Sequence, residues 1–347
     1  MWSLRVLDRR VISARMSKLF QRFQMMVMLA LSKQCLSFAC QYKDRTGAYK
    51  CPEWRDLNQG GTYEPSYNVP PKSYCPVLVD NHQLRADMPS ERVLTAMRWG
   101  LIPTWYPGDP QDFSVSTINC RIESATSRNS YKPAIAAGRR CIVIAEGYFE
   151  WMKPAKSAPK QAYFVYYQQT LDSSMSTRQW DCEGMEQLLF SEGRWLGPKL
   201  LTMAAIFDVN KGLHSFSILT MEAPSYMRWL HSRVPVILDG EDAVSSWLDP
   251  AYNFNELIGS IQFPNTLEWH RVPDLVGNPN NKGRQCVLPF DKPDVTPRQT
   301  MMDSWLNRSS TSGDAGPSSS RRSRSRSPIK AEEPGKESVE FSGESSA

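Results

Sequence analysis

Hydrophobic residues in the middle of the chain come in short runs between polar turn residues, without sustained helical periodicity. Runs of this kind, rich in β-branched and aromatic residues, are typical of strands. The predicted strands are Val77–Val79, Leu94–Trp99, Cys141–Phe149, Tyr163–Tyr167, Leu200–Phe207, Phe216–Met221 and Val236–Leu238. The predicted helices are Ser124–Ala136, Pro224–Trp229 and Glu241–Trp247. Many strands with few helices predict an α+β fold with a mainly antiparallel β core.

The balance of apolar and polar residues divides the chain into three parts. Residues 38–290 hold the predicted strands and most of the 11 tryptophans, and we expect them to form one domain. Residues 291–347 are rich in Ser, Gly, Pro and charge, with too few apolar residues to offset the entropy of ordering. We therefore expect a disordered C-terminal tail. Residues 1–37 are a basic leader unlike the rest.

Charge and cysteine usage narrow the classes of function. A net charge of +5 is modest for 347 residues and suits a local basic groove better than a wholly basic surface. The eight cysteines are scattered, with no C-x-x-C pair and no Cys/His spacing typical of zinc. We predict a reducing compartment, no structural metal and no cofactor. No apolar run reaches the length of a membrane span, so no membrane partner is expected.

The segment Gly138–Trp151 carries the strongest candidate for chemistry. Its residues Cys141–Ala145 fit a strand buried on both faces, and Glu150 follows where that strand should leave the core. Flanking aromatic side chains place the carboxyl in apolar surroundings, which favour its neutral form and suit an acid/base catalyst. Taken alone, a strand-end glutamate that faces water explains the segment better.

Two other places carry polar residues suited to binding or proton transfer. Asn119 and Arg121 lie two apart, on one face of a strand, where an arginine can hold a phosphate through charge-assisted hydrogen bonds. His231 precedes an apolar run, and an imidazole there can donate or accept a proton near neutral pH. From these residues alone, a surface arginine and a structural histidine are the simpler explanations.

An aromatic and basic set is formed by Trp99, Trp105 and Pro103 with Arg98, Arg139 and Arg140. Proteins that bind single-stranded DNA stack bases on aromatic rings and follow the phosphates with arginines. Core packing explains the tryptophans equally well at the level of sequence.

Five short motifs, taken together, resemble the SRAP family. They occur in the family's order and rough spacing: Pro65–Asn68, Met97–Trp105, Asn119–Glu123, Gly138–Trp151 and Leu230–Pro235. The resemblance runs from about Phe38 to Pro289, and five motifs in the right order are not expected by chance. It implies the family's fold, in which two sheets form a distorted barrel or sandwich with flanking helices.

The resemblance also implies roles for individual residues. The catalytic positions that it implies are Glu150, His231, Asn119 and Thr220. The DNA-binding positions that it implies are Arg121, Arg98, Trp99, Asn68, Arg139 and Trp151. In the family, the glutamate moves protons and the histidine donates a proton to the sugar oxygen of an abasic site. Leu230 and Val234 are mild departures beside His231 and leave that residue in its role.

The family's reaction needs a cysteine directly after the initiator methionine, in Met-Cys-Gly-Arg. Its α-amine attacks the aldehyde of an abasic site to give a Schiff base, and its thiol then closes a thiazolidine, which crosslinks protein and DNA. The crosslink shields the lesion in single-stranded DNA near replication forks. This sequence has Trp2 after Met1 and no Met-Cys-Gly-Arg, so as written it lacks the nucleophile.

Three functions stay open. The chain is an abasic-site crosslinking enzyme of lyase type if its true start differs, or a module that binds lesion-bearing single-stranded DNA without covalent capture. The third and weakest is a thiol autopeptidase, a hydrolase, because its nucleophile would be the same absent cysteine.

The leader has three explanations of its own. Its short apolar run, Met25–Leu31, has no clear cleavage site after it, which disfavours a secretory signal. Its basic, acid-poor character is closer to a mitochondrial presequence. We favour a third explanation, an alternative or wrongly assigned first exon, because the family similarity begins abruptly near Phe38.

The tail carries two short motifs. The segment 299–306 looks like a box that binds the sliding clamp PCNA, and one helical turn would align its key residues, Gln299, Met302, Trp305 and Leu306. An arbitrary amphipathic turn explains it equally well. The basic run 321–327 suits nuclear import, weak nucleic-acid contact or phosphorylation. We expect a monomer in the nucleus, on chromosomes at replication forks, or in mitochondria if the leader is real.

Overall fold

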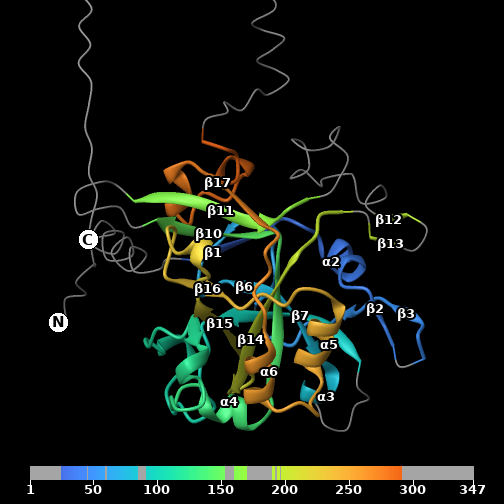
Figure 1. Cartoon of the computed structure of the whole chain (residues 1–347). Helices are drawn as coiled ribbons and strands as arrows, with labels where there is room; N and C mark the ends of the chain where they lie inside the picture. The colour runs from blue at the N-terminus through green and yellow to red at the C-terminus, as the bar shows by residue number, and fades with distance from the viewer. Residues whose placement is uncertain are drawn as a thin grey trace, which may run out of the picture. The chain divides into compact units, whose positions relative to one another are not determined.

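Two β-sheets make up most of the structure, and short helices pack against the larger one (Figure 1). The computed structural model describes residues 25–44, 46–58, 61–84, 91–152, 160–169, 190–191, 194–195 and 197–290. All of these belong to one unit, Met1–Asp294. The predicted α+β fold with a mainly antiparallel β core is confirmed. The tail predicted to be disordered lies outside the described residues.

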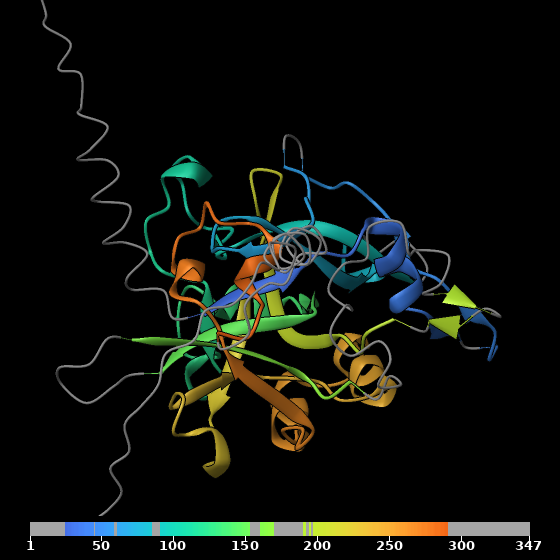
Figure 2. The ribbon, with the colours of Figure 1, turned by 90° about the horizontal axis from the view of Figure 1, so that it is seen from above.

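The smaller sheet has five antiparallel strands in the order β17-β11-β10-β1-β5. Their bounds are Met25–Leu29 (β1), Ser66–Val69 (β5), Gly147–Met152 (β10), Gln161–Tyr167 (β11) and Leu267–Arg271 (β17). Seen from above, the green strands β10 and β11 run beside the blue β1 (Figure 2). The first described strand is thus paired on both sides.

The larger sheet follows the order β16-β15-β14-β9-β6-β7-β4, and β8 pairs with β15. Its bounds are Glu53–Trp54 (β4), Tyr74–Asp80 (β6), Arg92–Trp99 (β7), Asn119–Arg121 (β8), Arg140–Ala145 (β9), Leu201–Asn210 (β14), Leu213–Glu222 (β15) and Arg233–Pro235 (β16). A short parallel pairing between β15 and β7 joins strands from the two ends of this order. The sheet is therefore a partly closed ring and not a complete barrel.

Short helices and two small hairpins complete the described elements. The α-helices are Lys33–Ala39 (α2), Asn81–Leu84 (α3), Lys132–Ala136 (α4), Glu241–Leu248 (α5) and Phe254–Ser260 (α6). The 3-10 turns are Pro110–Asp112 (η1), Ile122–Ser124 (η2), Ser225–Met227 (η3), Asp274–Gly277 (η4) and Arg284–Cys286 (η5). The hairpin strands are Tyr42–Lys43 (β2), Tyr49–Lys50 (β3), Phe190–Ser191 (β12) and Arg194–Trp195 (β13). Among the helices described, none has the length and apolar character needed to cross a membrane.

The main core lies between the two sheets. Val77 and Val143 from the larger sheet pack in one cluster with Val27 and Val165 from the smaller sheet, all of them buried. A second cluster covers the other face of the larger sheet, where Trp247 of α5 is buried. Burial of apolar area on both faces explains why the strands of the larger sheet are nearly continuous hydrophobic runs.

Residues 25–37, assigned to the leader from sequence, are part of this folded unit. All five residues of β1 are buried, and Ser32 caps α2 by accepting a hydrogen bond from the N–H of Cys35 at 3.2 Å. The described fold therefore begins at Met25, earlier than the predicted boundary at residue 38. A run that is apolar on both faces has no strand alternation, so the sequence did not distinguish it from a targeting segment.

The single strand predicted at Cys141–Phe149 is in fact two strands that belong to different sheets. β9 ends before Glu146 and β10 begins after it. At Gly147 a Cβ atom would lie 2.7 Å from the carbonyl oxygen of Val165 on β11, so this close approach of two backbones requires glycine. Because of this bend, Glu150 lies in the smaller sheet, whereas the preceding strand β9 lies in the larger sheet.

Glu146 holds β1 at that bend through two hydrogen bonds. Its backbone N–H donates to the carbonyl of Met28 at 2.9 Å, and its carboxylate Oε2 accepts the N–H of Ala30 at 2.6 Å. The side chain is 1% exposed. Burial raises the pKa of Glu146 to about 7, and the Ala30 hydrogen bond opposes this in part.

The predicted helices are only partly correct. The helix predicted at Ser124–Ala136 reduces to η2 and α4, and the helix predicted at Pro224–Trp229 reduces to the single turn η3. The helix predicted at Glu241–Trp247 is present as α5, with acidic residues in its first turn. Its N-cap is Gly240.

Candidate functional site

Glu150 lies on β10 with its side chain toward the core between the sheets. It shares this face with Tyr148, because side chains alternate along a strand. Glu150 is 4% exposed, and its Oε1 accepts the N–H of Trp151 at 3.2 Å. Its direct strand neighbours are Met25 on β1 and Tyr163 on β11. The carboxyl is therefore buried, and the simpler explanation of a glutamate facing water does not hold.

Tyr148 places a hydroxyl beside this carboxylate. Burial raises the pKa of Tyr148 well above its usual value, and the nearby charge of Glu150 raises it further. The hydroxyl is buried and has no hydrogen-bond partner among the described residues. A neutral phenol with an unused donor is uncommon in a core, since buried polar groups are usually paired. From the sequence, Tyr148 is predicted only as one of the aromatic residues that flank Glu150.

His231 lies at the end of the loop that contains η3, directly before β16. The loop is held by its backbone, because the N–H of His231 donates to the carbonyl of Met227 at 3.3 Å. Nδ1 of the half-buried ring lies 3.2 Å from the backbone N of Arg233 and 3.1 Å from its carbonyl oxygen, so one tautomer accepts from the N–H and the other donates to the carbonyl. This fixed ring can present its other edge to a neighbouring group.

The loop of His231 packs against the strands of the smaller sheet. The ring of Trp229 meets that of Tyr163 edge-on, with centroids 5.0 Å apart. Tyr163 is the direct β11 neighbour of Glu150. Leu230 is buried in the same cluster as Tyr148. The fold thus brings His231 and Glu150, which are distant in sequence, to neighbouring elements.

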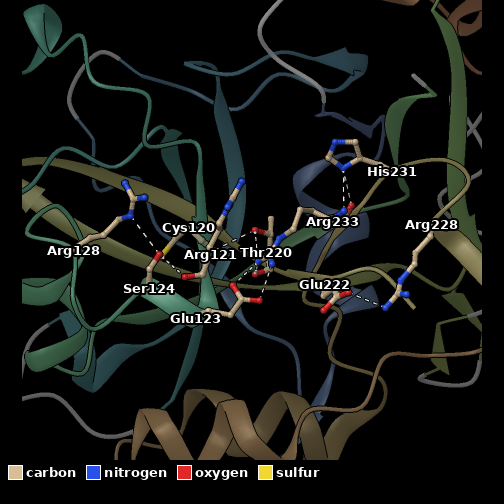
Figure 3. A network of polar contacts seen from close by, with 10 residues as sticks. All are labelled: Cys120, Arg121, Glu123, Ser124, Arg128, Thr220, Glu222, Arg228, His231 and Arg233. Atoms are coloured by element: carbon tan, nitrogen blue, oxygen red, sulfur yellow. Dashed lines mark hydrogen bonds and ion pairs between the residues drawn. The ribbon is translucent and has the colours of Figure 1, made fainter. Parts of the chain in front are cut away.

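The polar residues of β8 and β15 continue from this loop (Figure 3). Thr220 is the parallel neighbour of Arg121, and its carbonyl accepts from the guanidinium of Arg233 at 2.5 Å. Arg121 is exposed. Asn119, on the same strand, has a buried Oδ1 without a hydrogen-bond partner in the described part of the chain. These positions therefore form one continuous polar surface with the loop of His231.

Arg233 is a member of this surface that the sequence analysis missed. Its guanidinium binds both carboxylate oxygens of Glu123, at 2.7 and 2.8 Å (Figure 3). This ion pair lowers the pKa of Glu123, and the charge of Arg121 contributes to the same shift. Two guanidinium groups thus lie near one carboxylate. The sequence did contain a signal for Arg233, because this residue stands inside the motif Leu230–Pro235.

Three predicted DNA-binding residues lie in the core instead. Trp99 is 0% exposed, and its indole N–H donates to the carbonyl of Ile118 at 2.9 Å. Arg98 is also buried and donates to the carbonyl of Gly100 at 3.2 Å. Both side chains are thus engaged with backbone carbonyls, and base stacking at Trp99 and a phosphate contact at Arg98 stay predictions.

Asn68 is the third of these residues. Its side-chain amide donates to three backbone carbonyls, those of Val276, Asn278 and Asn281, at 2.9 to 3.3 Å. It is 0% exposed. A buried amide that satisfies three carbonyls ties β5 to the segment after β17 and has a structural task.

Arg139 is tied to the protein and not free for a phosphate. It forms an ion pair with the buried Asp208, and it donates to the hydroxyl of Thr104 at 3.3 Å. Asp208 also accepts the N–H of Thr104 at 2.8 Å. These contacts fix the loop that presents Trp105, which is 53% exposed and is the accessible tryptophan of the predicted aromatic set.

The remaining predicted residues are either half-buried or outside the described part. Trp151 packs half-buried on the face of β10 opposite to Glu150. The candidate clamp-binding residues Gln299, Met302, Trp305 and Leu306 lie outside the described residues. No group of metal-ligating side chains occurs in the portion of the chain that the structure describes.

Cys120 is the cysteine next to the polar surface, and its environment makes it unreactive. It is 0% exposed between Asn119 and Arg121. Burial raises the pKa of its thiol to about 12, so the thiolate is not populated near neutral pH. The described site therefore has acid/base groups and cations but no reactive thiol.

The fold and site define an α+β protein with a buried carboxylate and an arginine-bearing surface at the junction of two sheets. Residues 31–279 match the family model described as SOS response associated peptidase (SRAP). The chain therefore belongs to the SRAP family.

The curated relatives carry a common name. The rat protein named abasic site processing protein HMCES is 35% identical over 80% of each chain. The Xenopus tropicalis protein of the same name is 37% identical over 72% of this chain and 73% of its own. A solved structure of a Bacteroides thetaiotaomicron protein is 21% identical, with a TM-score of 0.48 over 65% of this chain and 85% of that chain.

Proposed function

We propose that this chain recognises abasic sites in single-stranded DNA. The sugar of the lesion is held beside Glu150 and His231, and the adjoining phosphate by the exposed Arg121. One observation carries the proposal. In the loop of His231, the ring of Trp229 contacts the ring of Tyr163, which is the direct strand neighbour of Glu150. The names of the relatives in rat and Xenopus tropicalis supply the substrate class.

Two unused polar atoms support a sugar as the ligand. The hydroxyl of Tyr148 is a buried donor, and Oδ1 of Asn119 is a buried acceptor, and neither has a partner among the described residues. An opened deoxyribose presents hydroxyl groups and an aldehyde, which can accept from the first and donate to the second. An exposed guanidinium at Arg121 suits the flanking phosphate.

We further propose that covalent capture depends on the residue placed directly before β1. An α-amine there attacks the aldehyde, and loss of one water gives an imine. A thiol on the same residue then adds to the imine carbon and closes a five-membered thiazolidine. Glu150 and His231 move the protons of these steps. Because Met25 is the direct neighbour of Glu150, a cysteine joined to Met25 begins close to the carboxylate.

The test compares two versions of the protein on an abasic single-stranded oligonucleotide. One is the full chain, and the other has residues 1–24 replaced by Met-Cys, so that removal of methionine leaves cysteine before Met25. Denaturing gels and intact mass follow the adduct, whose mass is that of protein plus DNA minus one water. We expect a heat-stable adduct only from the second version, and selective binding of the abasic strand by both.

The outcomes separate the functions. Binding without an adduct from either version rejects covalent capture and leaves a non-covalent lesion-binding module. Loss of any preference for the abasic strand rejects the proposal as a whole. An autopeptidase is disfavoured, because Cys120 beside the site is buried with a raised pKa.

A further inference from the structure

An exposed aromatic cluster adjoins the candidate site and has no part in the chemistry proposed above. Its rings come from β11, the η3 loop and β17. Trp229 contacts Tyr163 at 5.0 Å and Trp269 at 5.8 Å between centroids. Tyr226 stacks on Trp269 at 6.4 Å with an interplanar angle of 23° and also meets Phe263.

Two of these rings are presented to solvent by a loop that is anchored in the core. Trp229 is 42% and Tyr226 39% exposed, whereas Met227 and Leu230 beside them are almost fully buried. The hydroxyl of Tyr226 donates to the carbonyl of Pro264 at 2.7 Å, which fixes the ring at its edge. The exposed rings are therefore held in place before any ligand arrives, which lowers the entropy cost of binding.

The cluster is continuous with the site on both sides. Tyr163 beneath Trp229 is the direct strand neighbour of Glu150. Trp229 itself is two residues from His231. A DNA strand whose abasic sugar lies at Glu150 and His231 therefore has its adjacent nucleotides at these rings.

The charges around the rings favour nucleic acid as the occupant. Arg228 lies between Tyr226 and Trp229 in the chain, with a side chain that is 59% exposed. Its ion pair with Glu222, whose side chain is 70% exposed, is a surface pair of little strength and can yield to a phosphate. Exposed aromatic rings beside an exposed cation are the usual platform for unpaired bases.

We infer that Tyr226 and Trp229 form a stacking platform for an unpaired base next to the abasic nucleotide. This inference rests on the proposed function and extends it to the bases that flank the lesion. The platform selects single strands, because a base paired in a duplex keeps its faces covered by its neighbours. It would therefore set the preference of this chain for lesions in unpaired DNA.

The test measures the affinity of the full chain and of Trp229→Ala, Trp229→Phe and Tyr252→Ala for two oligonucleotides. One has a single abasic nucleotide among ordinary bases, and the other has abasic nucleotides at the flanking positions as well. Tyr252 lies between α5 and α6 and is 47% exposed, so it is a matched control for loss of a surface ring. Fluorescence anisotropy gives the affinities, and circular dichroism checks the fold.

We expect Trp229→Ala to weaken binding roughly tenfold on the first oligonucleotide and little on the second. Trp229→Phe should recover most of the loss, and Tyr252→Ala should match the original protein. An equal loss on both oligonucleotides, or none on either, would overturn the platform. If the platform is rejected in this way but Arg121→Glu abolishes binding, the proposed function stands without the platform. A wild-type chain with no preference for abasic DNA overturns both.

Discussion

Met25 and Glu150 are direct partners across the antiparallel pair β1–β10. This pairing fixes the start of the described fold beside a carboxylate that is 4% exposed. A residue joined to Met25 by a peptide bond therefore begins about one interstrand spacing from Glu150. The N-terminal strand is therefore part of the candidate site and not a leader that precedes it.

Replacement of Glu150 by Gln should separate capture from binding. The amide keeps the shape of the side chain but cannot transfer a proton, so capture by the version with cysteine before Met25 should slow by roughly 100-fold. Affinity for single-stranded DNA should stay the same. Quenched time courses on denaturing gels and anisotropy measure the two quantities. Glu53→Gln, at an exposed position on β4, is the control. Equal loss of capture and affinity would identify Glu150 as structural.

Reversal of charge at Arg121 should abolish DNA binding. The side chain is exposed beside the Arg233–Glu123 pair, so a glutamate would repel the phosphate and also compete for Arg233. Affinity should fall at least tenfold, and a single lost phosphate contact lowers the slope of log affinity against log salt by about 0.7.

The matched control for this charge reversal is Lys43→Glu on the separate β2–β3 hairpin. It changes the net charge equally, so it corrects for long-range electrostatics. Titrations at several salt concentrations give both slopes. Unchanged binding by Arg121→Glu would remove this residue from the DNA site.

The sequence predicts the fold class and several strands well because their hydrophobic runs are long and bounded by turns. It did not predict the division between β9 and β10, because apolar residues stand on both sides of Glu146 and Gly147, and the two strands are distinguished by their pairing in different sheets. It also misplaced the start of the fold, because β1 is buried on both faces.

The candidate site was predicted unevenly for a similar reason. A motif reports that a residue type recurs, but burial decides whether that residue is accessible. Trp99 and Asn68 stand in motifs beside the site, yet both are 0% exposed and donate hydrogen bonds from their side-chain nitrogen atoms to backbone carbonyls. Arg233 lies beside Thr220 only in three dimensions, whereas Tyr148, two residues from Glu150 on β10, is distinguished by its buried hydroxyl without a described partner.

Truncation of Asn68 to alanine should reduce stability rather than DNA contact. It removes the donor for three carbonyls of the segment after β17. We expect a loss of about 2–4 kcal/mol in the free energy of unfolding, measured by urea denaturation. Affinity per folded molecule should not change. Weaker binding with unchanged stability would restore the predicted role of Asn68 at the DNA.

Replacement of Glu146 by Gln should remove a pH dependence of stability. The folded pKa is raised by burial from 4.5 to about 7, so the folded state binds the proton more tightly than the unfolded chain. The resulting stabilisation is complete below pH 4.5 and is lost as pH rises through 7. Its full size is about 3 kcal/mol from the pKa difference.

The comparison of Glu146→Gln with the original protein isolates this effect from other groups. His214, whose pKa is lowered by burial, acts in the opposite direction, since its stabilisation is lost as pH falls below 6.5. It is present in both proteins and cancels in the difference. The free energy of unfolding of Glu146→Gln should therefore rise relative to that of the original protein as the pH increases from 5 to 8. Urea denaturation at several pH values measures this difference. A flat difference would mean that the buried carboxylate is already charged at pH 5 and is stabilised as an anion by the N–H of Ala30.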